Sequence, residues 1–316
     1  MHYIGVDLGG TTVKVGLLDN EYKIIDKMVA PTGSERTSEE ILKDMAILCK
    51  EIMDKHELSE KDIHSIGIGC PGIASPKEGI IYFSSNLDFD QVNVRKEIQK
   101  YINVDVYVDN DANCAALGEV ICGAAKGQDD VIVVTLGTGV GGGIVLGGKV
   151  YGGAFCGAGE IGHQIIQLDG HTCGCGRKGC WEQYASATAL IRDAKEAAIK
   201  NPETKMISLA ENGLEGINAK VVFDAAQSGD EVAKSVLDNY FRYIAHGLTN
   251  LINVLQPSMI VLGGGMSAQK ENLTIPVTKY IQEEMYGGLK LQTRIESAIL
   301  GNDAGIIGAA LVGTRL

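Results

Sequence analysis

The feature of this chain that most constrains its fold is a pattern of strand, glycine turn and strand that occurs twice, 128 residues apart. In the first copy, Gly9-Gly10 joins apolar strands at 3–7 and 13–18. In the second copy, the glycine-rich stretch 137–143 joins strands at 131–136 and 144–146. The identical pairs at this offset are Ile4 and Ile132, Val6 and Val134, Leu8 and Leu136, Gly9 and Gly137, and Leu18 and Leu146. Such a repeat predicts two related lobes.

The length and composition fit a globular protein of two domains. A chain of 316 residues is too long for one compact core, and 45% hydrophobic with 22% charged residues is an ordinary globular balance. The sequence has neither an apolar run long enough to span a membrane nor a basic and apolar leader, so we expect a cytoplasmic protein without a membrane partner. The net charge of −12 argues against a nucleic-acid partner. Nucleotides remain possible ligands because backbone N–H groups and a metal ion can hold phosphates in an acidic protein.

The hydrophobic periodicity predicts alternating strands and helices, and therefore an α/β protein. Further strands are predicted at 23–30, 65–70, 104–108, 259–262 and 291–296. Helices are predicted at 38–56, 112–119, 186–199, 219–227, 230–255, 270–286 and after Asp303. The first of these helices begins with a capping box between Thr37 and Glu40. The polar stretch 200–218 is predicted to be a loop.

Three glycine-rich patterns compete as nucleotide-binding loops. The stretch 143–150 nearly matches a P-loop, but Val150 lacks the hydroxyl that would bind Mg²⁺ and the expected helix does not follow. The stretch 137–142 matches G-x-G-x-x-G, but it leads into a β-like segment, whereas a dinucleotide-binding fold requires a helix there. The third interpretation takes the turns at 7–12 and 137–143 together, as hairpins of two facing lobes that hold a triphosphate.

In this third interpretation, backbone N–H groups and threonine hydroxyls bind the phosphates. The residues involved would be Gly9, Gly10, Thr11, Thr12, Gly137, Thr138 and Gly139. Asp7, at the end of the first strand, would hold Mg²⁺ through water. Two tight hairpins without a ligand remain the alternative.

Three of the eight cysteines gather in one segment, Cys173-Gly-Cys175-Gly-Arg-Lys-Gly-Cys180, and His163 precedes it. Three thiolates and one imidazole make a closed tetrahedral Zn²⁺ site, and the glycines let so short a loop surround one ion. A closed set leaves no position for a reacting water, so we expect a structural zinc. A disulfide or free thiols are the alternatives, and a cytoplasmic location disfavours the disulfide.

Together these motifs resemble those of the ROK family of sugar kinases, and within it the bacterial glucokinases. The matching motifs are Asp-x-Gly-Gly-Thr, Asn-Asp-Ala-Asn, Leu-Gly-Thr-Gly-Val-Gly-Gly-Gly, Gly-Glu-Ile-Gly-His and Cys-x-Cys-Gly-x-x-Gly-Cys-x-Glu, and they extend from Asp7 to Gly265. The resemblance implies a two-lobed actin-like ATPase (ribonuclease H-like) α/β fold with a central cleft, assembled as a homodimer or higher homo-oligomer. It also implies ATP-dependent phosphorylation of a hexose, foremost D-glucose, at the 6-hydroxyl. We assign 1–110 plus 300–316 to a smaller lobe and 111–299 to a larger lobe with the zinc loop.

The family's functional positions carry over residue by residue. Asp111 matches the catalytic base, and Asn86, Asn110, Glu160, His163 and Glu182 match sugar contacts, which also include Asp111 itself. His163, Cys173, Cys175 and Cys180 match zinc ligands, and Gly264 and Gly265 match the loop near the adenosine. A carboxylate at position 111 lies at a predicted helix N-terminus, which favours its ionised form. A plain N-cap would explain Asp111 as well.

The resemblance leaves the sugar open. Around Asn86 the chain has Ser-Asn-Leu-Asp-Phe, whereas many glucokinases have Asn-Leu followed by Gly and Trp. A kinase for mannose, fructose, allose or an N-acetylhexosamine is therefore an alternative, as is polyphosphate as the phosphoryl donor. A non-catalytic sugar-binding regulator is a further alternative. The family's DNA-binding repressors are disfavoured, because the first strand begins at Tyr3.

Overall fold

The structure is a computed structural model that describes residues 1–84 and 87–314. The predicted sugar contact Asn86 therefore lies outside the described residues. The chain divides into a first unit of Met1–Val133, Gly142–Gly159 and Ala298–Leu316 and a second unit of Val134–Gly141 and Glu160–Ser297. This division differs from the expected boundary after residue 110. Helix α3 (Asp111–Ile121) packs closely against α10 (Ala304–Leu311), so it belongs to the first unit.

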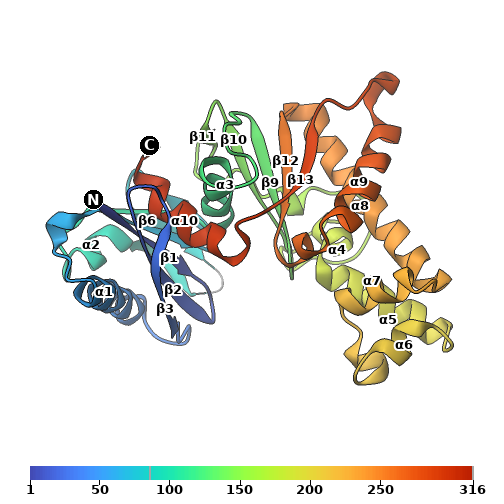
Figure 1. The fold of residues 1–316 in the computed structure, drawn as a ribbon, viewed down its shortest axis with the longest axis horizontal. Coiled ribbons are helices and arrows are strands. Elements are labelled where there is room, and N and C mark those ends of the chain that lie inside the picture. Colours follow the sequence, from blue (N-terminus) through green and yellow to red (C-terminus); the bar gives the residue numbers. More distant parts are fainter. Residues whose placement is uncertain (85–86, 315–316) are drawn as a thin grey trace. The chain divides into compact units, whose positions relative to one another are not determined.

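The first unit contains a mixed five-stranded sheet in the order β3-β2-β1-β4-β8. Figure 1 labels its strands β1, β2 and β3, in blue, beside α1 (Ser38–Lys55) and α10. The strands are β1 (His2–Leu8), β2 (Thr12–Leu18), β3 (Ile24–Pro31), β4 (Ile63–Cys70) and β8 (Val106–Asn110). The first three form an antiparallel meander, whereas β4 and β8 run parallel to β1. The five predicted strands of this region are confirmed to within two residues at every end. The apolar residues of β1, β2, β4 and β8 are mostly buried, whereas β3 at the edge of the sheet has no buried residue.

A row of three glycines crosses this sheet and lets α10 approach its backbone. Gly5 of β1 is in register with Gly16 of β2 and with Gly67 of β4. A Cβ on Gly5 would lie 1.9 Å from the carbonyl oxygen of Ile306, and one on Gly67 would lie 1.7 Å from that of Ala309. Any side chain at these positions would therefore push α10 away from the sheet.

The other face of the sheet packs against α1 (Ser38–Lys55), and α2 (Val94–Ile98) lies beside α1. The predicted capping box is present, since Thr37 accepts the backbone N–H of Glu40 and the Glu40 carboxylate accepts the N–H of Thr37. A small antiparallel sheet of β5 (Ile73–Ser75), β6 (Ile80–Ser84) and β7 (Phe89–Asn93) was not predicted, because its strands are short and interrupted by turns.

The second five-stranded sheet repeats the topology of the first. Its order is β11-β10-β9-β12-β13, with β9 (Val131–Leu136), β10 (Val140–Leu146), β11 (Lys149–Val150), β12 (Met259–Gly263) and β13 (Arg294–Ser297). The strand after each repeated glycine turn, β2 or β10, lies beside the strand before it, β1 or β9. β13 is parallel to β12, as β8 is to β4. The predicted repeat is therefore confirmed at the level of strand order.

The remaining helices belong to the second unit. They are α4 (Glu182–Ala185), α5 (Ala187–Lys200), α6 (Lys205–Leu209), α7 (Ala219–Gln227), α8 (Glu231–Leu255) and α9 (Glu271–Glu284). The prediction of a loop over 200–218 is wrong, because α6 forms there. Thr204 caps α6, and the Asp230 carboxylate accepts the Thr204 hydroxyl and the Lys205 N–H. These bonds come from a residue far along the chain, which local sequence patterns cannot show.

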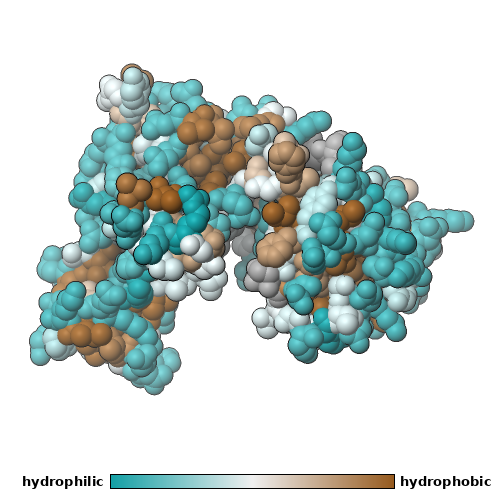
Figure 2. Space-filling model, turned by 180° about the vertical axis from the view of Figure 1, so that it is seen from behind, coloured by the Kyte–Doolittle hydropathy of each residue, from teal (hydrophilic) through white to brown (hydrophobic). Residues whose placement is uncertain are grey.

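The surface visible in Figure 2 is mainly hydrophilic, with smaller hydrophobic patches among the polar side chains. Among the described residues, none of the helices is long and apolar enough to span a membrane.

Candidate active site

One edge of the first sheet, at the carboxyl ends of three neighbouring strands, carries acidic residues. Asp7 of β1 is in register with Gly69 of β4, and Gly69 is in register with Asp109 of β8. Neighbouring strands lie about 4.8 Å apart, so the backbones at Asp7 and Asp109 are separated by roughly 10 Å. Asp111 follows at the first position of α3. Ligands of open α/β sheets bind at such carboxyl edges.

The turn between β1 and β2 is the tight hairpin that the sequence predicts. The N–H of Gly9 donates to the carbonyl oxygen of Thr12 at 3.0 Å. The hydroxyl of Thr32 donates to the Gly9 carbonyl at 2.6 Å. Gly10 and Thr11 form the tip of the turn. The half-buried Asp7 carboxylate lies 2.8 Å from the Lys14 ammonium, which places one cation beside this turn.

The junction of β8 and α3 separates the cap of the helix from its acidic residue. Asn110 is the N-cap, and its side-chain oxygen accepts the N–H groups of Ala112 and Asn113. Its amide nitrogen donates to the Gly72 carbonyl at 3.0 Å. The interpretation of Asp111 as the N-cap is therefore wrong. Asp111 is exposed at the first helical position, immediately after the cap.

Asp109 supports this junction, and the sequence analysis did not identify it. One of its carboxylate oxygens accepts the N–H of Asn110 at 2.7 Å and the side-chain amide of Asn113 at 2.9 Å. Burial raises the pKa of Asp109 from 3.8 to about 6, although both hydrogen bonds oppose the shift. The sequence pattern that could have identified Asp109 is an acidic residue near the end of the apolar strand β8.

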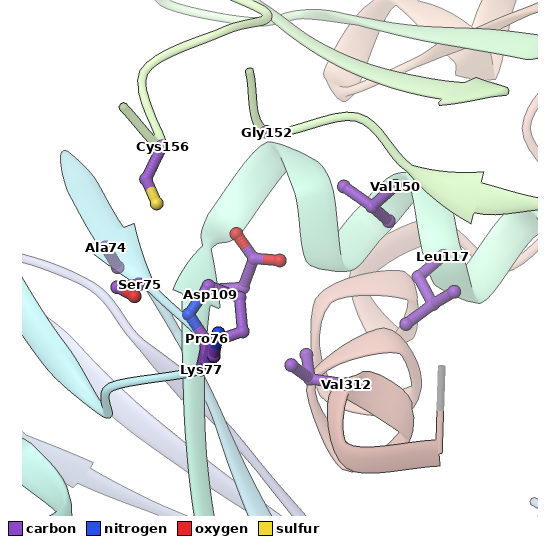
Figure 3. Close-up of a pocket in the computed structure, with 10 residues that line it drawn as sticks. All are labelled: Ala74, Ser75, Pro76, Lys77, Asp109, Leu117, Val150, Gly152, Cys156 and Val312. Carbon is purple, nitrogen blue, oxygen red and sulfur yellow. The ribbon is translucent and has the colours of Figure 1, made fainter. Parts of the chain in front are cut away.

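A cavity with a partly apolar wall lies beside Asp109. The cavity has a volume of about 190 Å³ and includes the side chains of Leu117, Val150 and Val312 in its wall. Figure 3 shows the Asp109 carboxylate among these apolar side chains and the thiol of Cys156. An apolar wall stabilises the neutral acid relative to the carboxylate, in agreement with the raised pKa of Asp109.

The second glycine turn, between β9 and β10, is also a hairpin, and β10 follows it where the dinucleotide-binding interpretation needed a helix. The P-loop interpretation needed a helix from Lys149 onward, where the chain forms β11 instead. The N–H of Gly137 donates to the Gly139 carbonyl at 3.0 Å. The start of α5 holds the turn from outside, because the N–H of Ala187 donates to the Gly137 carbonyl and the hydroxyl of Thr188 donates to the Thr138 carbonyl, both at 2.8 Å.

Gly264 lies against the strand that leads into this turn. It has a φ of +73°, and a Cβ there would lie 2.5 Å from the carbonyl oxygen of Leu136. Gly265 follows at the start of a short 3₁₀ helix. The structure thus brings the predicted adenosine loop and the second phosphate turn together within the second unit.

The four predicted metal ligands form one cluster in the second unit. The ligand atoms of His163, Cys173, Cys175 and Cys180 all lie within 4.8 Å of one another. The Sγ atoms of Cys175 and Cys180 are 3.6 Å apart, and the Cys173 Sγ is 3.7 Å from the His163 Nδ1. A tetrahedral ion with Zn–S bonds of about 2.3 Å needs S···S distances of about 3.8 Å. The cluster can therefore hold a tetrahedral metal ion with little rearrangement.

The backbone geometry of the loop fits a metal site, and burial affects the pKa values of its thiols. Gly179 has a φ of +79°, and a Cβ there would lie 1.7 Å from the Gln167 carbonyl oxygen, so this turn of the loop needs glycine. Burial raises the pKa of Cys173 and raises that of Cys180 to about 12, whereas a backbone N–H from Arg177 lowers the pKa of Cys175. A bound cation would offset the cost of ionising these buried thiols.

His163 contacts both the cysteine cluster and Glu160, and Glu182 makes further contacts. The His163 ring directs Nδ1 to Cys173 and Nε2 to the Glu160 carboxylate, 3.9 Å away. One ring can therefore bind a metal and still present its other nitrogen. Glu182 accepts the Val140 N–H with one oxygen at 3.1 Å, and its other oxygen lies 3.6 Å from the Cys173 thiol. Its predicted sugar contact stays a prediction.

Comparisons with known proteins identify the family of the chain. The model of the ROK family matches residues 3–315. A glucokinase of Halalkalibacterium halodurans is 37% identical over 308 residues, which cover 97% of this chain and 93% of that protein. The crystal structure of a ROK family glucokinase from Streptomyces griseus in complex with glucose and AMPPNP is similar with a TM-score of 0.83 and 36% identity over 98% of each chain.

The family also contains proteins of another kind. A xylose repressor of Caldicellulosiruptor bescii is 30% identical over 305 residues, which cover 96% of this chain and 76% of the repressor. The similarity to solved ROK kinases confirms the predicted actin-like ATPase fold, in which the two sheets share one topology. From its motifs, its repeated sheets and these similarities, we conclude that the chain belongs to the ROK family.

Proposed function

We propose that this chain is an ATP-dependent hexose kinase that phosphorylates the 6-hydroxyl of its sugar, with D-glucose as the first candidate and glucose 6-phosphate as the product. The observation that carries the proposal is the position of Asp111. Its exposed carboxylate begins α3 at the sheet edge that also carries Asp7 and leads into the first glycine turn. The similarity to glucokinases, one of them solved with glucose and AMPPNP, supports the same reaction.

In this reaction, Asp111 accepts the proton of the sugar hydroxyl as its oxygen attacks the terminal phosphorus of ATP, and ADP leaves. A sugar hydroxyl is a weak nucleophile at neutral pH, so alignment and charge neutralisation contribute most of the acceleration and the base contributes less. Because Asn110 caps α3, the helix does not depend on the Asp111 carboxylate for its cap.

The phosphates are proposed to bind to the N–H groups and hydroxyls of the two glycine turns, and the adenosine to Gly264 and Gly265. Mg²⁺ supplies charge neutralisation on the phosphate oxygens when it is bound with ATP. The Asp7 carboxylate suits a water-mediated contact to this ion, because it lies at the sheet edge beside the first turn.

The sugar is proposed to contact Asn86, Asn110, Asp111, Glu160, His163 and Glu182. Carboxylates and amides suit a hexose because its hydroxyls both donate and accept hydrogen bonds. We propose Zn²⁺ in the cluster of His163 and the three cysteines, where four protein ligands leave no open position. Zinc there would fix the loop that presents the His163 Nε2 atom and Glu182.

Coupled turnover with Mg²⁺-ATP and a panel of hexoses tests the proposal. We expect phosphorylation of D-glucose. A preference for mannose, fructose, allose or an N-acetylhexosamine would change the assigned substrate, but the protein would still be a hexose kinase. Polyphosphate in place of ATP tests the donor. Sugar binding without turnover of any hexose would reject the kinase and favour a non-catalytic regulator, the candidate supported by the similarity to a xylose repressor. Light scattering tests the proposed homo-oligomer.

A further inference from the structure

Each of the two repeated glycine turns accepts a hydrogen bond from a threonine hydroxyl outside the turn. In the first unit, Thr32 lies just after β3, and its hydroxyl donates to the Gly9 carbonyl at 2.6 Å. In the second unit, Thr188 lies in the first turn of α5, and its hydroxyl donates to the Thr138 carbonyl at 2.8 Å. The two threonines come from different kinds of element, so the repeat of the strands does not by itself explain the shared contact.

The direction of a carbonyl determines the direction of the next N–H group. A peptide unit is planar and trans, so its C=O and N–H bonds point in opposite directions. A hydroxyl that holds the Gly9 carbonyl therefore orients the N–H of Gly10. In the same way, Thr188 orients the N–H of Gly139 through the Thr138 carbonyl.

Other bonds restrain the same two turns. The N–H of Thr32 donates to the Thr11 carbonyl at 2.9 Å, so Thr32 holds the first turn at two points. In the second turn, Glu182 accepts the N–H of Val140. A Cβ on Gly139 would lie 2.2 Å from the Glu182 carboxylate, so the turn passes directly beside this side chain.

We propose that Thr32 and Thr188 are positioning residues for nucleotide binding: their hydroxyls hold the two glycine turns so that the N–H groups of Gly10 and Gly139 point at the phosphates. This inference deepens the proposed function and rests on it for the identity of the ligand. Preorganised N–H groups bind an anion more tightly than mobile ones, because the backbone loses less freedom on binding.

The test measures the affinity of the full-length protein for a non-hydrolysable ATP analogue with Mg²⁺ by titration calorimetry. Thr32→Val and Thr188→Val each remove one hydroxyl at nearly constant volume, and each is expected to weaken nucleotide binding about five-fold. Thr32→Ser and Thr188→Ser keep the hydroxyl and should stay within about two-fold of the wild type. Thr278→Val removes the same kind of bond inside α9 and is the matched control, with unchanged nucleotide affinity.

The affinity for the hexose separates positioning from general loss of structure. We expect the hexose affinity to stay the same in all variants. The unfolding temperature of Thr188→Val should also equal that of the wild type, since the Thr188 side chain is exposed. Valine variants that bind the analogue as tightly as the wild type, or serine variants that lose as much as valine variants, would overturn the inference. If Thr32→Val does not fold, the comparison of Thr188→Val with Thr188→Ser tests the inference by itself. A wild-type protein that binds the nucleotide but phosphorylates no hexose would reject the proposed kinase activity. The affinities of the variants for the nucleotide would still test the role of the two threonines.

Discussion

Replacing Asp109 by asparagine is expected to stabilise the protein, and to do so more at alkaline than at acidic pH. Asp109 is only 7% exposed, and the wall of the cavity beside it is partly apolar. Burial raises its pKa from 3.8 to about 6. Asparagine has nearly the same shape and retains an oxygen that can accept the N–H of Asn110 and the side-chain amide of Asn113.

The sign and size of the effect follow from the two pKa values of Asp109. Because its pKa is higher in the folded state, the folded state binds more protons between about pH 4 and pH 6. The contribution of the neutral acid to stability is complete below pH 4 and is lost as the pH rises through 6. The difference between a pKa of 3.8 and one of about 6 corresponds to a loss of about 3 kcal/mol of stability once the pH is well above 6, and about 1.4 kcal/mol of that loss develops between pH 5 and pH 8.

Urea unfolding of wild type and Asp109→Asn at pH 5 and pH 8 measures this difference. The two proteins share all other titrating groups, so the change in their difference in unfolding free energy isolates Asp109. We expect the variant to gain about 1.4 kcal/mol more at pH 8 than at pH 5. Asp90→Asn, at an exposed position of the same unit, is the control and should show no such change. An equal difference at both pH values, or a larger gain at pH 5, would refute the reasoning.

Three further predictions concern the proposed catalytic base, the metal cluster and the contact between α3 and α10. Asp111→Asn should lower the turnover number at least a hundred-fold while calorimetry shows retained hexose binding; substantial residual turnover would contradict the assignment. Cys175→Ser should remove one of four ligands, so elemental analysis should find less than one zinc per chain, with a lower unfolding temperature and a higher Michaelis constant for the sugar. An unchanged constant in a zinc-free sample would count against coupling of metal and sugar. Gly308→Ala should destabilise the protein by about 3 kcal/mol or prevent folding, because the new Cβ would lie 1.6 Å from the Cys114 carbonyl oxygen. Gly265→Ala, where a Cβ meets open space, is its control for unfolding, and equal stability of the two variants would show that the helices can separate at little cost.

Residues close together in the sequence allowed correct predictions of local structure. The capping box of α1 joins positions only three apart, and both glycine hairpins close within a few residues. The cysteine cluster was predicted for the same reason, since Cys173, Cys175 and Cys180 lie on one short loop. Each of these features depends on turn chemistry or side-chain spacing that a short stretch of sequence contains in full.

Contacts between distant segments account for what the sequence analysis missed. Helix α6 is held by Asp230, and α3 belongs to the first unit because it packs on α10. Glu182 joins Cys173 to the amide of Val140, 42 residues away, and Thr188 reaches Thr138 across 50 residues. The sequence alone determined the repeated hairpins, the histidine and cysteine residues of the metal cluster and the family motifs, because these depend on residue identity and local spacing. Only the tertiary structure decided which side chain holds which turn and which carboxylate is desolvated, because hydrogen bonding and burial depend on groups that the chain brings together when it folds.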